Sequence, residues 1–193
     1  MKLSLDCDAF YFAKFIDSGL SARIIKHLNQ HFDLSEYENI QLTESESVDI
    51  TPWKFNFLSE ELAEKNLFPD YHGRHCVVFP ELAELFQKVN LKLKTKFDVC
   101  VCLFYPDGKE FIDFHHDYPA FGPTNIIASL SLGAPRNFLI REQTTKDITQ
   151  RILLESNSLL VMGEGFQEKY EHSLPADPET LTPRFNFTFR QFA

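Results

Sequence analysis

The segment RFNFTFR, residues 184–190, alternates polar and aromatic residues over its whole length. Successive side chains of a β-strand point to opposite faces, so the polar residues would share one face and the phenylalanines the other. The polar residues are Arg184, Asn186, Thr188 and Arg190. The aromatic face predicts a buried core. Two arginines with an amide between them are typical of a pocket for a dicarboxylate, because a planar guanidinium pairs with both oxygens of a carboxylate. A solvent-exposed strand face is the alternative.

Strand-like segments follow one another at short spacing from residue 97 to the C-terminus, with turn residues between them. Besides RFNFTFR they are FDVCVCLFY (97–105), EFIDFHHD (110–117), NIIASLSLG (125–133), NFLIRE (137–142), RILLE (151–155), SLLVMG (158–163) and QEKYEHSL (167–174). The 20 phenylalanines also favour a β-rich interior, since aromatic side chains pack well on pleated sheets. We therefore predict an α+β chain that is mostly β, a sandwich or jelly roll flanked by helices.

The N-terminal half has the spacing of helices. Residues 20–32 and the segment that begins at Pro80 each carry apolar residues on one helical face. Ser59 is placed to cap a short helix, and residues 36–57 predict short strands and loops.

A chain of this length is expected to form one domain, residues 1–193. We expect residues 1–96 to give helical support and a candidate substrate lid, and residues 97–193 to form the core with a metal site. Arg74 and Trp53 are candidates for the lid, with a core or surface role as the alternative.

The segment Phe114-His115-His116-Asp117 predicts a metal site. On a strand His115 and Asp117 would share one face and His116 would point away, which favours a structural or surface role for His116. His172, in a later strand-like segment, is the natural third ligand. Two imidazoles and one carboxylate with open positions suit non-haem iron(II). A core histidine that bonds to Asp117 is the alternative for His115.

Charge and composition restrict the partners. The net charge of −9 argues against strong non-specific binding to phosphate backbones, although it leaves room for a local basic groove. No apolar run approaches the length of a membrane-spanning helix and no secretory signal is apparent, so we expect no membrane partner. The four cysteines form neither a disulfide ladder nor a zinc motif, which favours reduced thiols in the cytoplasm.

With His115-x-Asp117, His172-Ser-Leu-Pro and the RxNxTxR pattern of residues 184–190 in this order, the chain resembles the AlkB-like family of iron(II)- and 2-oxoglutarate-dependent oxygenases. The resemblance runs from about Phe97 to the C-terminus. It implies a double-stranded β-helix (jelly-roll) core, iron(II) held by the two histidines and the aspartate, and 2-oxoglutarate as cosubstrate with O2.

The resemblance also implies roles for the cosubstrate pocket. Arg184 would pair with the distal carboxylate of 2-oxoglutarate, Asn186 would hydrogen-bond to the cosubstrate, and Arg190 would lie near the metal end. Tyr105 matches a tyrosine whose hydroxyl reaches the same distal carboxylate. The asparagine that usually precedes this tyrosine is absent here, where Cys102, Leu103 and Phe104 stand.

The family implies oxidative demethylation of alkylated bases in single-stranded DNA or RNA, as in DNA repair. Members that repair methylated bases carry acidic residues just after the metal motif, whereas Asp117 is followed here by Tyr-Pro-Ala-Phe. Tyr118 and Phe121 are candidate stacking residues for a flipped base. The alternatives are hydroxylation or demethylation of a protein side chain or small molecule, and a jelly-roll binding module without catalytic turnover.

Overall fold

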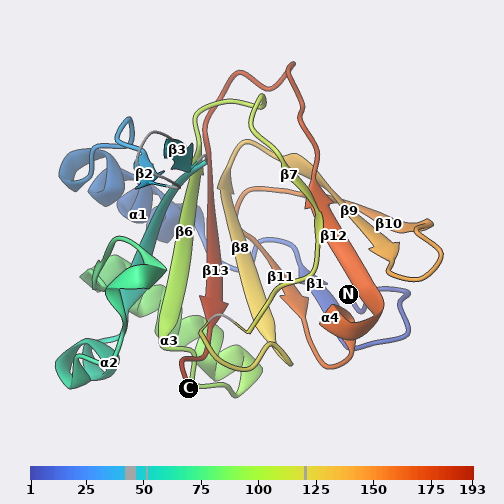
Figure 1. Ribbon diagram of the computed structural model, residues 1–193, viewed down its shortest axis with the longest axis horizontal. Coiled ribbons are helices and arrows are strands. Elements are labelled where there is room, and N and C mark those ends of the chain that lie inside the picture. Colours follow the sequence, from blue (N-terminus) through green and yellow to red (C-terminus); the bar gives the residue numbers. More distant parts are fainter. Residues whose placement is uncertain (42–46, 51, 120) are drawn as a thin grey trace.

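A computed structural model describes residues 1–41, 47–50, 52–119 and 121–193 (Figure 1). Two sheets dominate it. The larger has seven strands in the order β1-β11-β8-β13-β6-β4-β5, and the smaller has four in the order β10-β9-β12-β7. β2 and β3 pair separately. The predicted jelly-roll core, mostly β and flanked by helices, is confirmed.

The strands of the larger sheet come from both halves of the chain. They are β1 (Ala9–Phe12), β4 (Trp53–Leu58), β5 (His75–Val77), β6 (Val99–Tyr105), β8 (Ile127–Gly133), β11 (Ser158–Met162) and β13 (Arg184–Arg190). The smaller sheet contains β7 (Ile112–His115), β9 (Arg136–Glu142), β10 (Ile148–Leu154) and β12 (Tyr170–Leu174). The separate pair is β2 (Glu38–Gln41) and β3 (Ser47–Ile50).

The helices begin where the sequence offers caps. The helices are α1 (Ser18–His31), α2 (Glu60–Lys65), α3 (Pro80–Leu93) and α4 (Phe166–Lys169), with a short 3-10 turn at Asp70–His72. Asp17 accepts a hydrogen bond from Leu20 N at the start of α1, and Ser59 caps α2 as predicted. Pro80 occupies the first turn of α3, where its missing N–H is tolerated.

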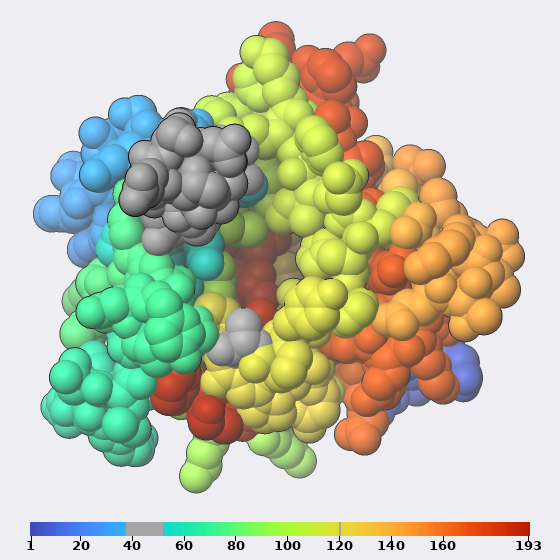
Figure 2. Space-filling view, in the orientation of Figure 1, coloured from blue at the N-terminus to red at the C-terminus, as the bar shows by residue number. Residues whose placement is uncertain are grey.

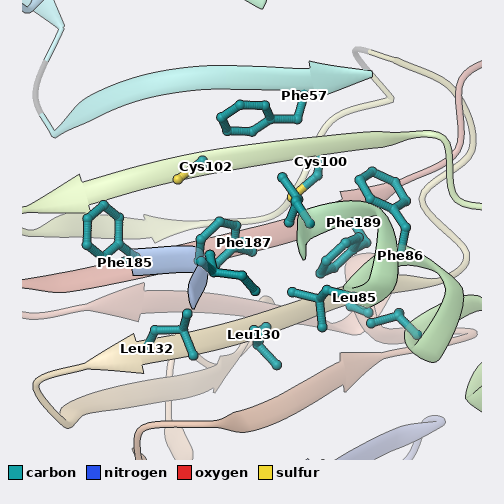
Figure 3. Close-up of a cluster of buried hydrophobic side chains, with 14 of the residues drawn as sticks. Phe57, Leu85, Phe86, Cys100, Cys102, Leu130, Leu132, Phe185, Phe187 and Phe189 are labelled. Atoms are coloured by element: carbon teal, nitrogen blue, oxygen red, sulfur yellow. The ribbon is translucent and has the colours of Figure 1, made fainter. Parts of the chain in front are cut away.

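The main apolar core lies between the helices and one face of the larger sheet (Figure 3). The three phenylalanines of β13 are buried there, and the ring of Phe189 meets that of Phe86 from α3 edge-to-face at 5.0 Å. Cys100 and Cys102 lie in the same core as free thiols. A second core draws its side chains from both sheets and from α4.

The short strands predicted within residues 36–57 include β4, and residues 1–96 contribute three strands to the larger sheet besides their helices. Two predicted strand boundaries are wrong. Residues 167–169, predicted as strand, belong to α4, and only 170–174 continue as β12. β7 ends at His115, so Asp117 lies beyond the strand rather than in it. Of the short strands and loops predicted for residues 36–57, residues 42–46 and 51 fall outside the described part of the chain.

Within the described residues, no helix combines the length and apolar character needed to cross a membrane.

Candidate active site

A cavity of about 460 Å³ opens between the two sheets. It is visible as the hollow near the centre of Figure 2, with the dark red C-terminal segment at its floor. All the residues predicted for the metal and cosubstrate line it, from β6, β7, β12, β13 and the loop after β7: Tyr105, His115, Asp117, His172, Arg184, Asn186 and Arg190. The polar face predicted for β13 therefore faces this cavity, and the alternative of a solvent-exposed face is wrong.

Strand pairing brings the two histidines together. In the antiparallel pair of β7 and β12, His115 and His172 are direct partners, and their ring centroids are 4.3 Å apart. One ligand atom from each of these histidines and from Asp117 lies within 4.8 Å of the other two. Nε2 of His172 is 4.0 Å from Oδ2 of Asp117. This set of atoms can converge on a single ion, which is the arrangement that the sequence predicts.

The surroundings of both imidazoles fit a metal. Nδ1 of His115 is 2.7 Å from the carbonyl oxygen of Asp113, which can only accept, so Nδ1 donates and Nε2 keeps its lone pair for an ion. Burial lowers the pKa of His172 to about 4, although the nearby Asp117 opposes the shift. His172 is therefore neutral at pH 7, the form in which an imidazole binds metal.

Asp117 is held by contacts with other elements of the fold. Its backbone N–H donates to Oε1 of Gln167 at 2.9 Å. Arg190 donates through Nη2 to the carbonyl oxygen of Tyr118 at 2.7 Å, and its Nη1 is 3.9 Å from Oδ1 of Asp117. Because the chain has left the strand, His116 lines the cavity and does not point away from it as predicted. The ring of His116 lies 4.7 Å from that of Tyr118.

Arg184 is buried at the floor with donors that nothing in the described structure satisfies. Its Nη2 donates to Ser131 Oγ at 3.0 Å and to Asn186 Oδ1 at 2.9 Å. Its Nε and Nη1 are buried and have no hydrogen-bond partner among the described residues. Since a buried unpaired donor is costly, these atoms indicate a site for an anionic ligand. Burial lowers the pKa of Arg184 to about 10.

Tyr105 lies directly opposite Arg184 in the pairing of β6 and β13. Burial raises the pKa of Tyr105 to about 12, although Arg184 nearby opposes the shift, so the phenol stays protonated and can donate a hydrogen bond. Asn186 donates through Nδ2 to Thr188 Oγ1 at 2.8 Å, and its Oδ1 accepts from Ser129 Oγ at 3.1 Å. The floor of the cavity therefore offers donors at one place, as a carboxylate requires.

Aromatic side chains surround the mouth of the cavity. Tyr118 is 68% exposed and Tyr71 is 84% exposed, and both line the cavity. Phe121 is buried, and its ring lies 4.7 Å from His72 and stacks on Phe68 at 5.7 Å. Both predicted stacking residues thus reach the cavity, Tyr118 from the outside and Phe121 as part of its wall.

Sequence reasoning missed several of the residues around the cavity. Lys54, Tyr71 and His72 line it from the N-terminal half, so the predicted lid region does reach the mouth. The two lid candidates do not line it: Trp53 is buried in the core, and the guanidinium of Arg74 lies 5.4 Å from the Trp53 ring centroid. The spacing of residues in the sequence does not identify Lys54 or Gln167, because both reach the site through contacts with residues distant in the chain.

Comparison with known families agrees with this geometry. The family model of the 2OG-Fe(II) oxygenase superfamily matches residues 8–190. The mouse protein named alpha-ketoglutarate-dependent dioxygenase alkB homolog 3 is 33% identical over 120 residues, which cover 58% of this chain and 42% of that protein. Bovine DNA oxidative demethylase ALKBH2 is 32% identical over 122 residues, covering 58% and 43%.

One solved structure extends the similarity to the whole chain. The structure of OsALKBH1 superposes with a TM-score of 0.66 at 17% identity and covers 98% of this chain and 100% of that one. This shows the fold. The match to the curated relatives above spans about two fifths of their length, 42% for the mouse protein and 43% for the bovine one.

Proposed function

Because the chain belongs to the 2OG-Fe(II) oxygenase superfamily and is AlkB-like, as predicted, we propose that it is an iron(II)- and 2-oxoglutarate-dependent dioxygenase that demethylates alkylated nucleic-acid bases. In this proposal His115, Asp117 and His172 hold the iron, and Arg184 holds the distal carboxylate of 2-oxoglutarate. Residues 1–193 act as one domain, in which the N-terminal half supplies part of the mouth of the cavity.

One observation carries the proposal. A single cavity contains both a cluster of three ligand atoms within 4.8 Å and a buried arginine whose Nε and Nη1 lack partners among the described residues. The first matches a facial iron site, and the second matches a dicarboxylate that has one end at the metal. A binding module without turnover would need neither feature.

When bound, iron(II) and 2-oxoglutarate supply the activation of O2 and the oxidation of a C–H bond. The chain's own residues prepare the site for this chemistry. The carbonyl of Asp113 fixes the tautomer of His115, and burial keeps His172 neutral. Tyr105 and Arg184 present donors at the floor. Apolar side chains in the wall, among them Phe138 and Leu174, exclude water from the centre.

The proposed substrate is an alkylated base in single-stranded DNA or RNA. Support comes from the relatives named as AlkB homolog 3 and as a DNA oxidative demethylase, and from the tyrosines at the mouth, since a flipped base needs aromatic faces on which to stack. A role in DNA repair and a cytoplasmic location with reduced thiols are parts of the same proposal.

The charge of the cavity favours an uncharged base. Among the residues that the structure describes, Asp117 is the only carboxylate that lines the cavity, and it lies against the metal. With iron(II), 2-oxoglutarate and the two arginines of β13 in place, the formal charge of the centre is positive. A like charge at about 8 Å in a medium of effective dielectric about 20 costs about 2 kcal/mol, or roughly thirtyfold in binding. We expect 3-methylthymine to be preferred over cationic 3-methylcytosine by about that factor.

The test is mass spectrometry of single-stranded oligonucleotides that carry methylated bases, incubated with protein, iron(II), ascorbate and 2-oxoglutarate. Loss of a methyl group that requires 2-oxoglutarate and disappears in His115→Ala supports the proposal. His31→Ala is the matched control, because His31 is exposed on α1 and does not line the cavity. Equal activity in His115→Ala and His31→Ala would rule out the proposed iron site.

A second candidate function is oxidation of a protein side chain or a small molecule. The net charge of −9 favours it, because nucleic-acid enzymes usually present a basic face. Formation of succinate from 2-oxoglutarate without any change in the oligonucleotides would support this function and refute base demethylation.

A further inference from the structure

Asp117, the proposed carboxylate ligand, lies outside the strands that carry the two histidines. β7 ends at His115, which is also its last residue paired with β12. The ladder that orients His115 and His172 therefore stops before Asp117. A carboxylate ligand outside a sheet needs another support for its backbone, because metal ligands depend on the groups that orient them.

The described structure offers that support in α4. Gln167 is buried, and its Oε1 accepts the backbone N–H of Asp117 at 2.9 Å. The other end of the same amide, Nε2, contacts Sδ of Met162 at 3.8 Å, and Met162 also lines the cavity. The orientation of the amide is thereby fixed, since an N–H donor can pair only with the oxygen.

α4 itself is anchored from behind. Gln143, just after β9, donates through Nε2 to the carbonyl oxygen of Gln167 at 2.8 Å, and its backbone N–H donates to the carbonyl of Lys169 at 2.9 Å. Gly165 precedes the helix at φ 79°, in the left-handed region that favours glycine, and so allows the sharp entry into the helical turn. The helix is thus joined to the smaller sheet and not only to its own strand.

The same short helix also packs close to a second ligand. Phe166 is fully buried, and its ring centroid lies 6.0 Å from that of His172. His172 also stacks on Phe138, with ring centroids 5.3 Å apart. Two consecutive residues of α4 thus contact the proposed metal ligands. Phe166 packs near His172, and Gln167 accepts a hydrogen bond from the backbone of Asp117.

We propose that α4 is the element that sets the geometry of the metal site, with Gln167 as the positioning residue for Asp117. The inference rests on the proposed iron site and adds to it the residue that holds a ligand lying outside the sheet. Removal of the amide would leave the backbone of Asp117 without its hydrogen-bond acceptor and allow the carboxylate to move away from the two histidines.

The experiment uses cobalt(II) alone as the probe, added to the metal-free full chain and followed by visible absorption and titration calorimetry. Gln167→Met keeps the size of the side chain but removes the carbonyl acceptor, and Gln167→Glu keeps an oxygen at that position. Gln87→Met is the matched control, because Gln87 is exposed on α3 and does not line the cavity.

We expect Gln167→Met to bind cobalt(II) about 10- to 100-fold more weakly, with an altered visible spectrum, as changes of groups that orient ligands typically do. Gln167→Glu should restore most of the affinity, and Gln87→Met should match the wild type. A purely structural role would instead lower the melting temperature of the metal-free protein and leave the spectrum of the bound cobalt unchanged.

The outcomes separate the two proposals. If the wild type and Gln87→Met bind cobalt(II) and Gln167→Met binds it equally well with the same spectrum, the role of Gln167 is refuted and the iron site stands. If the wild type does not bind cobalt(II), the proposed iron site fails and this inference fails with it. Should Gln167→Met not fold, hydrogen exchange of the Asp117 amide in the wild type decides: protection supports the hydrogen bond, and exchange at the rate of an exposed loop overturns it.

Discussion

Replacement of Arg184 by methionine should separate ligand binding from stability. Arg184 is only 1% exposed, and its charge is buried with two donor atoms that have no hydrogen-bond partner among the described residues. The lowering of its pKa from 12.5 to about 10 by burial corresponds to about 3 kcal/mol by which the fold disfavours the charged form. A dicarboxylate at this position would relieve that cost.

Two opposing terms determine the stability of Arg184→Met. The variant loses the hydrogen bonds to Ser131 and Asn186, worth about 1 kcal/mol each. It gains from removal of a buried, incompletely paired charge, which is commonly neutral or stabilising by about 1–4 kcal/mol when a hydrophobic residue of similar volume takes its place. We therefore expect the free energy of unfolding of the ligand-free variant to lie within about 1 kcal/mol of wild type, or above it.

Binding should respond very differently. Two charge-assisted hydrogen bonds to a carboxylate contribute at least about 3 kcal/mol, so the Kd for 2-oxoglutarate should rise roughly a hundredfold or more. Urea unfolding with and without 2-oxoglutarate, and calorimetric titration with cobalt(II) present, measure both quantities. Arg151→Met, at an exposed position on β10, is the matched control. A variant that loses several kcal/mol of stability yet binds 2-oxoglutarate normally would show that Arg184 is structural and that the cosubstrate binds elsewhere.

Three further predictions follow from burial and charge. Burial lowers the pKa of His172 in the folded protein from 6.5 to about 4. The stability of the chelator-treated protein should therefore be complete above pH 6.5 and fall by up to about 3 kcal/mol as the pH drops toward 4. A His172→Gln variant with the same pH profile of unfolding would contradict this. Phe187→Ala removes a fully buried ring and should cost about 3–5 kcal/mol in urea unfolding, whereas a cost below about 1 kcal/mol would mean that the site repacks freely. Tyr105→Phe should raise the Kd for 2-oxoglutarate by about fivefold, the equivalent of one hydrogen bond of about 1 kcal/mol. A loss of affinity as large as that of Arg184→Met would mean that the hydroxyl does more than donate one hydrogen bond.

Where the pattern of the sequence is local, it predicted the structure well. The alternation in residues 184–190 identified both faces of β13, because the period of a strand is fixed by its backbone. The family motif predicted that His115 and His172 bind the same metal. The alternation of side chains along each strand could not predict that they pair directly, since the register between distant strands depends on the whole sheet.

Features that depend on distant contacts were not predicted from the sequence. Residues 167–169 look like the start of a strand, but packing of Phe166 and the left-handed turn at Gly165 make them a helix. β7 ends at His115, its last residue paired with β12, and His116 beyond this end lines the cavity. Short strands were predicted within residues 36–57, but their place in the larger sheet was not, because β4 pairs with β6 from the other half of the chain and β5 pairs with β4.

The division of β13 into a core face and a pocket face leaves little tolerance for insertions and deletions. Loss or gain of one residue within residues 184–190 would turn the arginines into the apolar core and the phenylalanines into the cavity, so folding and cosubstrate binding would fail together. A change of two residues would keep the alternation intact but carry Arg184 about 7 Å along the strand, away from its neighbours Tyr105 and Gly133. Such a chain would fold and yet be unable to anchor its cosubstrate. Length changes in this family should therefore accumulate in the loops that border β13 and be absent from the strand itself.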